Sequence, residues 1–242
     1  MPQISEQNQP SSFPHYRSDD YTSVIYDGVY YPEEREDDMG ETSVHIKLLA
    51  NLLSILKLYF KNRQDVFLSG NMNLYFERGN SRRWFAPDLL VAFGVPNVER
   101  SSYLLFREKV FPQVIFEIAS EKTWRNDVDE KLRTYEQYGA EEYYVLDPEY
   151  AYLPAPLMAF RRENDKLSPV QITDDRIFSP RLGLEIVWTE NNFRLFNPQV
   201  NKFLSTLEES ETEKNIFESR AITAEAEIER LKAEIERLKA QN

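Results

Sequence analysis

The sequence predicts an α/β fold, and three observations carry this prediction. Apolar residues recur at steps of three and four over residues 42–63, which is the period of an amphipathic helix. Short apolar runs separated by Gly, Asn and Pro follow between residues 65 and 118, as expected of strands and turns. A second helical pattern and a further strand come next, and such mixing is typical of layered α/β domains.

The first predicted helix opens at Thr42 or Ser43, either of which can cap it, and continues to about Arg63. The apolar residues of one face are Leu48, Leu49, Leu52, Leu53, Leu56, Tyr59 and Phe60. Strands are then predicted at residues 65–68, 72–77, 88–93 and 113–118.

The second predicted helix spans Thr123–Tyr138, and Gly139 is its expected C-cap. A strand at residues 142–146 follows and is stopped by Asp147-Pro148. Extra strands beside this core are predicted at residues 157–162, 170–172 and 184–188. Together these elements define a domain over residues 42–200.

Negative charge is concentrated in the N-terminal segment. The chain has a net charge of −12, and residues 1–41 hold ten acidic residues against Arg17 and Arg35. Residues 1–31 lack a sustained period, and Glu33–Asp38 is an acidic run, so residues 1–41 are predicted to be a mobile segment. Residues 42–200 are nearly neutral, so their net charge does not indicate nucleic-acid binding, although a local basic groove is compatible with it.

The C-terminal segment, residues 201–242, is predicted to form a coiled-coil helix. Its apolar seam alternates steps of four and three through Phe217, Ala221, Ala224, Ile228, Leu231, Ile235 and Leu238. Isoleucine at one core position and leucine at the other favour a parallel two-stranded coil, so a homodimer through residues 217–238 is expected. A single solvated helix is the alternative.

Several classes of protein are excluded or disfavoured. The chain has no Cys and only two His, His15 and His45, which argues against disulfide scaffolds, thiol catalysis and structural zinc sites. It also lacks a Gly-x-x-x-x-Gly-Lys phosphate loop and a Gly-x-Ser-x-Gly elbow. No apolar run approaches the length of about 18 residues that spans a membrane, and no secretory signal is evident. A cytoplasmic protein without a membrane partner is expected.

Two acidic residues occupy unusual places. Glu117 lies inside an apolar strand, where a carboxylate is costly unless it is paired, hydrogen-bonded or bound to a metal. Asp88 opens another apolar strand directly after Pro87. If the two meet they repel each other, and a hard divalent cation such as Mg²⁺ would relieve the repulsion. The alternatives are an edge-strand acid facing water and a salt bridge to an arginine.

These acids belong to an ordered set of motifs. The motifs are Pro87-Asp88, Glu117-Ile-Ala-Ser120, Asp127-x-x-x-Lys131-x-x-x-Tyr135 and Gly139-Ala-Glu-Glu-Tyr-Tyr-Val-Leu-Asp-Pro148. Over residues 45–188 the set resembles the Uma-type family of putative restriction endonucleases in the PD-(D/E)xK nuclease superfamily. The resemblance implies a restriction-endonuclease-like fold, with a central mixed sheet flanked by helices.

The resemblance also implies an activity: metal-dependent hydrolysis of phosphodiester bonds in nucleic acid, with DNA as the expected substrate. Asp88, Glu117 and the carbonyl group of Ile118 would hold Mg²⁺ or Mn²⁺. The superfamily places a lysine two residues after the acid, where this chain has Ala119. Lys131 on the following helix would take its place, orienting water or stabilising negative charge, and Lys122 is a weaker candidate.

Four residues are possible supporting groups. Asp127 and Tyr135 share a helix stripe with Lys131, although an ordinary surface Asp–Lys pair is the alternative. Glu41 would be an outer acid or a cap of the first helix. His45 resembles a histidine of the family's first helix, and a packing role is the alternative.

Residues 78–84 are predicted to form a basic, aromatic turn. Arg78, Arg82 and Arg83 would contact phosphates, and Trp84 would stack on a base, unless the segment is a solvated hairpin turn. An alternative function for the whole chain is a catalytically inactive nuclease-fold module that interacts with a partner and dimerises through its coil.

Overall fold

The computed structural model describes residues 25–31, 42–190 and 192–239. The chain divides into two compact units, one ending at Phe203 and the other beginning at Leu204, and each is described by itself. Among the described helices, none has the length and apolar character needed to cross a membrane.

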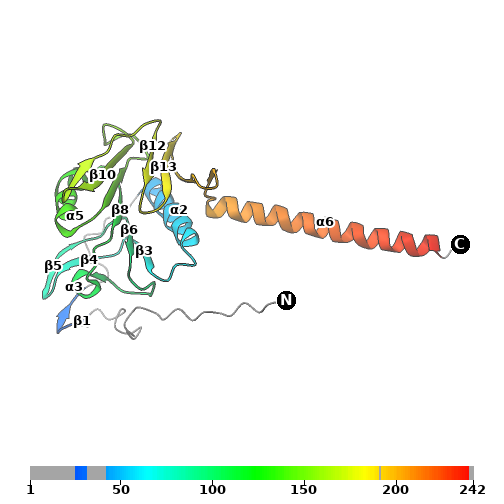
Figure 1. Ribbon diagram of the computed structural model, residues 1–242, viewed down its shortest axis with the longest axis horizontal. Coiled ribbons are helices and arrows are strands. Elements are labelled where there is room, and N and C mark those ends of the chain that lie inside the picture. The colour runs from blue at the N-terminus through cyan, green and yellow to red at the C-terminus, as the bar shows by residue number, and fades with distance from the viewer. Residues whose placement is uncertain (1–24, 32–41, 191, 240–242) are drawn as a thin grey trace. The chain divides into compact units, whose positions relative to one another are not determined.

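A six-stranded mixed sheet forms the centre of the first unit (Figure 1). Its order is β11 (Lys166–Pro169), β10 (Leu157–Glu163), β9 (Glu142–Leu146), β8 (Val114–Ile118), β6 (Leu89–Phe93) and β3 (Val66–Gly70). Strands β8 and β9 are parallel, and all other neighbours are antiparallel. Both β8 and β9 are buried along their whole length, which explains their nearly continuous apolar sequences.

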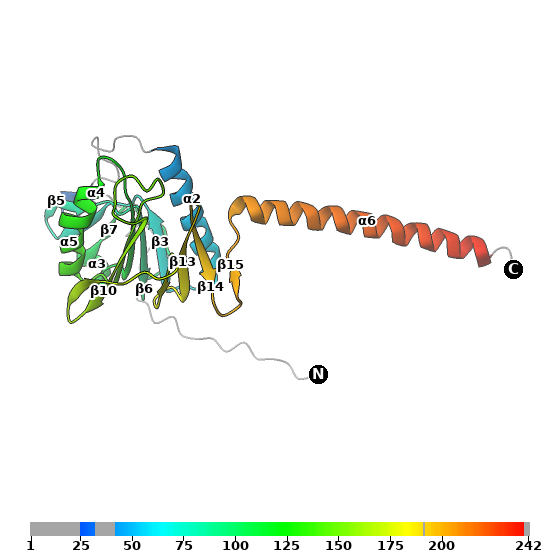
Figure 2. The same ribbon diagram turned by 90° about the horizontal axis from the view of Figure 1, so that it is seen from above.

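Helices flank this sheet, which confirms the predicted fold class. Figure 2 shows α2 (Ser43–Tyr59) on one side and the segment from α4 (Trp124–Asn126) to α5 (Leu132–Tyr138) on the other. Between α4 and α5, residues Asp127–Lys131 form a π-helical turn, η1. Gly139 ends α5 in the left-handed conformation, with φ of 105°, as the sequence predicts.

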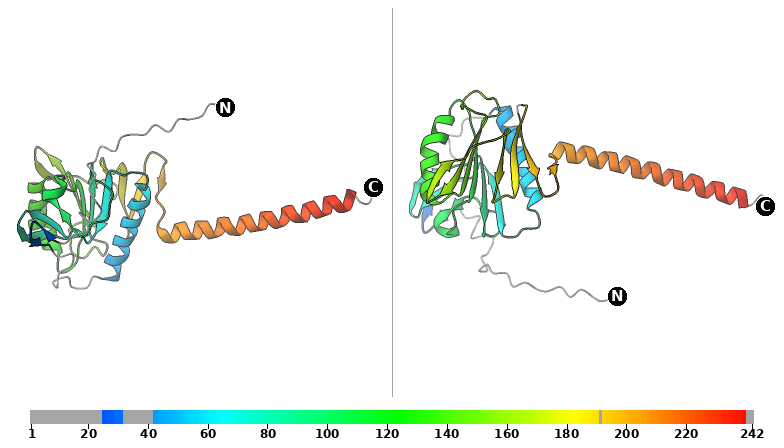
Figure 3. Two further views of the ribbon diagram at one scale, coloured as in Figure 1. Left: turned by 90° about the horizontal axis from the view of Figure 1, so that it is seen from below. Right: turned by 45° about the horizontal axis from the view of Figure 1, so that its top comes forward.

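Two further sheets, of four and three strands, belong to the same unit. An antiparallel sheet of β12 (Arg176–Ser179), β13 (Leu184–Thr189), β14 (Asn192–Asn197) and β15 (Lys202–Phe203) lies beside α2 (Figure 3). A three-stranded sheet contains β5 (Asn80–Phe85), β4 (Leu74–Glu77) and β7 (Tyr103–Leu104), with α3 (Leu105–Glu108) directly after it. The second unit is a single helix, α6 (Leu207–Lys239).

Residues 25–31 have a defined structure that the sequence does not predict. Strands β1 (Ile25–Tyr26) and β2 (Val29–Tyr30) form a hairpin around Asp27-Gly28, both with positive φ, which is the turn that favours such short hairpins. Tyr31 follows with 1% exposure, and its hydroxyl accepts a hydrogen bond from the backbone of Gly79 at 2.7 Å. The acidic run Glu33–Asp38 lies outside the described residues.

Three expectations need correction. The strand predicted at residues 170–172 is absent from this described stretch, because Asn164-Asp165 forms a tight turn with positive φ and β11 pairs with β10 earlier, at Lys166–Pro169. The basic segment at 78–84 is not all turn, since β5 begins at Asn80. The first helix ends at Tyr59, before residue 63, with Thr42 as its cap.

Candidate functional site

Glu117 is a fully buried carboxylate in the middle of the central sheet. It shares a face with Ile115 of β8 and with Ala119, the residue that follows the strand, because alternate residues of extended chain point the same way. That face packs with Tyr135 and Tyr143, on the side covered by α4, η1 and α5. The phenol of Tyr135 donates to Glu117 Oε1 at 2.6 Å, and the ammonium of Lys131 donates to Oε2 at 2.9 Å.

Asp88 lies next to Glu117 because β6 and β8 are antiparallel neighbours, with Leu89 opposite Phe116. The backbone N–H of Ile118 donates to Asp88 Oδ2 at 2.5 Å, and the N–H of Asp88 itself points to Glu117 Oε2 at 3.3 Å. The two acids therefore converge at the end of β8. His45 of α2 completes the arrangement, with Nε2 at 3.1 Å from Asp88 Oδ1.

Lys131 reaches the acids from the helical side. Its ammonium lies 2.9 Å from Glu117 Oε2 and 2.9 Å from Asp127 Oδ1, and its side chain is 11% exposed. Ala119, two residues after Glu117, is buried in the core cluster that also contains Tyr135 and Tyr143. Lys122, the weaker candidate, is exposed. The Lys131 ammonium thus lies directly beside the Glu117 carboxylate.

The π-helical turn explains how three helix residues face one strand. In a regular α-helix, residues spaced four apart drift steadily around the axis, so Asp127 and Tyr135 would diverge. The wider turn at η1 opposes this drift, and Asp127, Lys131 and Tyr135 all face β8. Such turns occur often at functional sites.

The site contains three carboxyl groups, of Asp88, Glu117 and Asp127, and one ammonium group, of Lys131. Burial raises the pKa of Glu117 to about 8; the Lys131 ammonium opposes this shift, whereas the carboxylates of Asp88 and Asp127 add to it. Burial likewise raises the pKa of Asp127.

The pKa of Lys131 is also raised, but here burial opposes the shift and the neighbouring charges cause it. Burial by itself would lower the pKa of its ammonium, but the carboxylates of Glu117, Asp127 and Asp88 outweigh burial and raise it. Lys131 is therefore a permanent cation in this site. It can orient a nucleophile or stabilise negative charge, but it cannot act as a general base near neutral pH.

The donor set fits a divalent cation that also binds a substrate. Within the described residues, no three His, Asp or Glu side chains form a group that could hold a metal alone. Mg²⁺ is, however, commonly bound through one or two carboxylates, several waters and substrate phosphates. Asp88 and Glu117 supply two such carboxylates, and a cation would favour their ionised forms against the burial that chiefly raises the Glu117 pKa.

The remaining predicted residues have other surroundings. Glu41 lies outside the described residues. Arg78 forms an ion pair with Asp27 and lies over the ring of Tyr26, so it holds the N-terminal hairpin. Arg82 and Arg83 are exposed on β5, and Arg83 pairs with Glu77 at 3.5 Å.

Tyr143 is a site residue that sequence reasoning misses. Its hydroxyl donates to the backbone carbonyl of Asp127 at 2.8 Å, which ties the π-helical turn to β9. The signal that could have found it is a tyrosine inside the fully buried strand Glu142–Leu146, since a buried phenol usually has a hydrogen-bond partner.

A solved structure and a family model are similar to this chain, whereas a search of curated proteins finds no match. The crystal structure of a protein described as a putative nuclease belonging to DUF820, from Anabaena variabilis ATCC 29413, matches with a TM-score of 0.45 and 14% identity, over 65% of this chain and 80% of that one. The family model Uma2, described as "Putative restriction endonuclease", matches residues 30–193 and so includes Asp88, Glu117 and Lys131. The chain belongs to the Uma2 family.

Proposed function

We propose that the chain is a metal-dependent endonuclease that hydrolyses phosphodiester bonds, with DNA as its substrate and Mg²⁺ or Mn²⁺ as its cofactor. The observation that carries the proposal is the convergence of Asp88, Glu117 and Lys131 at one end of β8. Membership of the Uma2 family supports the same reaction class.

Each residue has a role that follows from its contacts. Asp88 and Glu117, with the carbonyl of Ile118, would hold the cation, whose chemistry is to activate a water and neutralise charge on the phosphate. The N–H of Ile118 and His45 orient the Asp88 carboxylate, and Tyr135 orients that of Glu117. Lys131, kept protonated by its neighbours, would steady the negative charge that the phosphate gains.

The proposed partners are DNA and a second copy of the chain. Arg82 and Arg83 are exposed on β5, which shortly precedes Pro87-Asp88 in the chain. We therefore propose that they contact DNA phosphates beside the site. The second copy would bind through the seam at residues 217–238.

Activity tests the proposal directly. We expect the wild-type chain to nick plasmid or cut oligonucleotide DNA with Mg²⁺ or Mn²⁺, and Asp88→Asn to lower the rate about 100-fold or more. Asparagine keeps the shape and an oxygen acceptor for the N–H of Ile118, so the loss would reflect charge. Asp129→Asn is the matched control, because Asp129 is exposed and paired with Arg133.

Equal rates in the wild type and Asp88→Asn, including no cleavage by either, would contradict the proposed activity. A reduced rate in Asp129→Asn as well would point to a general effect of removing negative charge, and would equally count against the assignment of Asp88.

Metal binding can be measured without activity. We expect Mg²⁺ to raise the melting temperature of the wild-type chain, because the ion binds the folded site and the stabilisation reaches about 2.7 kcal/mol at 100 times Kd. Asp88→Asn should lose this shift, whereas Asp129→Asn should keep it. The measurement is differential scanning calorimetry with and without Mg²⁺ at constant ionic strength. Equal shifts in all three proteins would show that the ion binds elsewhere.

A further inference from the structure

Helix α6 exposes a row of large apolar side chains. Phe217, Ile228, Leu231 and Ile235 are 77%, 50%, 48% and 51% exposed. They recur at the alternating steps of a heptad seam, with isoleucine at the first core position and leucine at the second. Phe217 is the first apolar residue of the seam, because the core position before it is occupied by Lys214. An apolar stripe of this kind fits the equivalent stripe of another helix.

Charged residues flank the seam in a pattern that changes sign. In a parallel, in-register pair of such helices, each residue that precedes the first core position faces the residue five positions later on the other helix. The first of these contacts would join Arg220 to Glu225 of the second copy. The following contacts would join Glu227 to Lys232 and Glu234 to Lys239, so the basic and acidic sides exchange places after the first contact.

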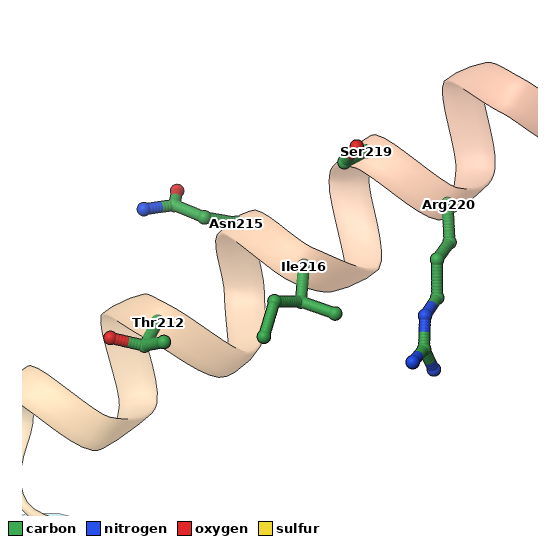
Figure 4. Close-up of a pocket in the computed structure, with 5 residues that line it drawn as sticks. All are labelled: Thr212, Asn215, Ile216, Ser219 and Arg220. Carbon is green, nitrogen blue, oxygen red and sulfur yellow. The ribbon is translucent and has the colours of Figure 1, made fainter.

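The described contacts leave Arg220 and Glu225 free to pair with another helix. Arg220 and Glu225 have no ion-pair partner among the described residues, and Figure 4 shows Arg220 extending away from the helix ribbon. Glu227 and Lys232 pair along their own helix with Arg230 and Glu229 at 2.8 Å. Exposed pairs of that kind contribute little, so they can exchange for contacts across the seam.

We propose that α6 pairs with α6 of a second copy in a parallel orientation and in a single register. The register is determined by the contact of Arg220 with Glu225, in which the basic and acidic positions are exchanged relative to the later contacts. A shift by one heptad would place Arg220 opposite Lys232, and Glu227 opposite Glu225. An antiparallel pair would place glutamates opposite glutamates and lysines opposite lysines along the rest of the seam. In both cases like charges meet, so both arrangements are disfavoured.

The inference specifies the arrangement of the homodimer proposed above and has a consequence for the nuclease. The first unit ends at Phe203 and α6 begins at Leu207. In a parallel coil, the first units of both copies precede the same, N-terminal end of the paired helices. The dimer would then carry two active sites, which suits cleavage of both strands of one DNA molecule. This last point rests on the proposed function.

Disulfide trapping tests orientation and register. The chain has no natural cysteine, so Ala221→Cys and Ile228→Cys each introduce a single thiol in successive core layers. Each full-length variant is oxidised with oxidised glutathione, alone and as a mixture in which one variant carries a mass tag. We expect each variant to link to its own kind, and the mixture to give no tagged–untagged product joining 221 to 228.

Each of the other outcomes would contradict a specific part of the proposal. Monomer mass in light scattering would overturn both the dimer and its register, whatever the nuclease assay shows. A dimer that links 221 to 228 would overturn the register, since those positions are about 10 Å apart along one helix. A dimer that fails to self-link at both positions would overturn the parallel orientation. Cleavage of DNA is measured separately, and its absence would not affect these results.

Charge reversal supplies an independent measurement. We expect Arg220→Glu to raise the dimer Kd about tenfold, because two attractive contacts become repulsive. Combining it with Glu225→Arg should restore the wild-type Kd. The combined variant should also permit the 221–228 link, because all three contacts then have the same polarity. Arg237→Glu, on the outer face of the helix, is the control and should not change Kd. An unchanged Kd in Arg220→Glu would overturn the assigned contact.

Discussion

Replacing Lys131 by methionine is expected to lower DNA cleavage about 100-fold or more and to destabilise the fold at the same time. Methionine fills similar space without the charge, so the Glu117 and Asp127 carboxylates lose the cation that lies 2.9 Å from each. Breaking a buried ion pair from one side typically costs about 3–5 kcal/mol. The measurements are the rate of plasmid nicking with Mg²⁺ and the free energy of unfolding in urea.

The stability loss should depend on pH in a defined direction. Without Lys131, the pKa values of Glu117 and Asp127 rise further, so at acidic pH both carboxyls take up protons and the loss becomes smaller. Lys122→Met is the matched control, because Lys122 is exposed, and it should leave both quantities unchanged. If Lys122→Met abolishes cleavage and Lys131→Met does not, the catalytic lysine has been assigned to the wrong residue.

Replacing Glu117 by glutamine should abolish cleavage yet leave the metal-free fold equally stable or more stable above neutral pH. The pKa of Glu117 is about 8 in the folded chain against an ordinary value of 4.5. Between these values the folded state binds more protons than the unfolded state, so wild-type stability falls as pH rises from about 4.5 to 8, by a few kcal/mol. Glutamine cannot ionise, and Lys131 still pairs with Asp127.

The measurement is urea unfolding from pH 5 to pH 9 in the presence of a chelator. The decline should become shallower in Glu117→Gln but not vanish, because burial also raises the pKa of Asp127. Glu121→Gln changes an exposed acid nearby and should reproduce the wild-type profile. A Glu117→Gln profile as steep as that of the wild type would mean that Glu117 does not titrate in this range.

Much of the fold follows from local sequence signals. The sequence predicts strand β9 with its bounds, Glu142–Leu146, because the apolar run from Tyr143 ends at Asp147-Pro148. Gly139 likewise identifies the end of the second helix, because glycine is the usual residue at a left-handed C-cap. In contrast, β5 carries Arg82, Arg83 and Trp84 on an intermediate to exposed strand, so it has no apolar run that would predict it. Its strand conformation depends on pairing with β4, which a local pattern does not reveal.

The residues of the candidate site are predictable from the sequence, but their geometry is not. A carboxylate within an apolar strand and an acid that opens another strand are enough to single out Glu117 and Asp88. Spacing alone does not show that Lys131 contacts both Glu117 and Asp127, because a surface pair has the same spacing. The contact depends on η1 and on Tyr143, whose hydroxyl holds the backbone of Asp127.

The π-helical turn also bears on comparisons among chains of this family. A π turn contains one residue more than the regular helical turn it replaces, so Asp127–Lys131 behaves like a single-residue insertion. A homologue with an uninterrupted helix here would be one residue shorter between the acid of β8 and the lysine. Alignments that forbid a gap at this point would then set its lysine one position away from Lys131, and would wrongly score an intact site as degenerate.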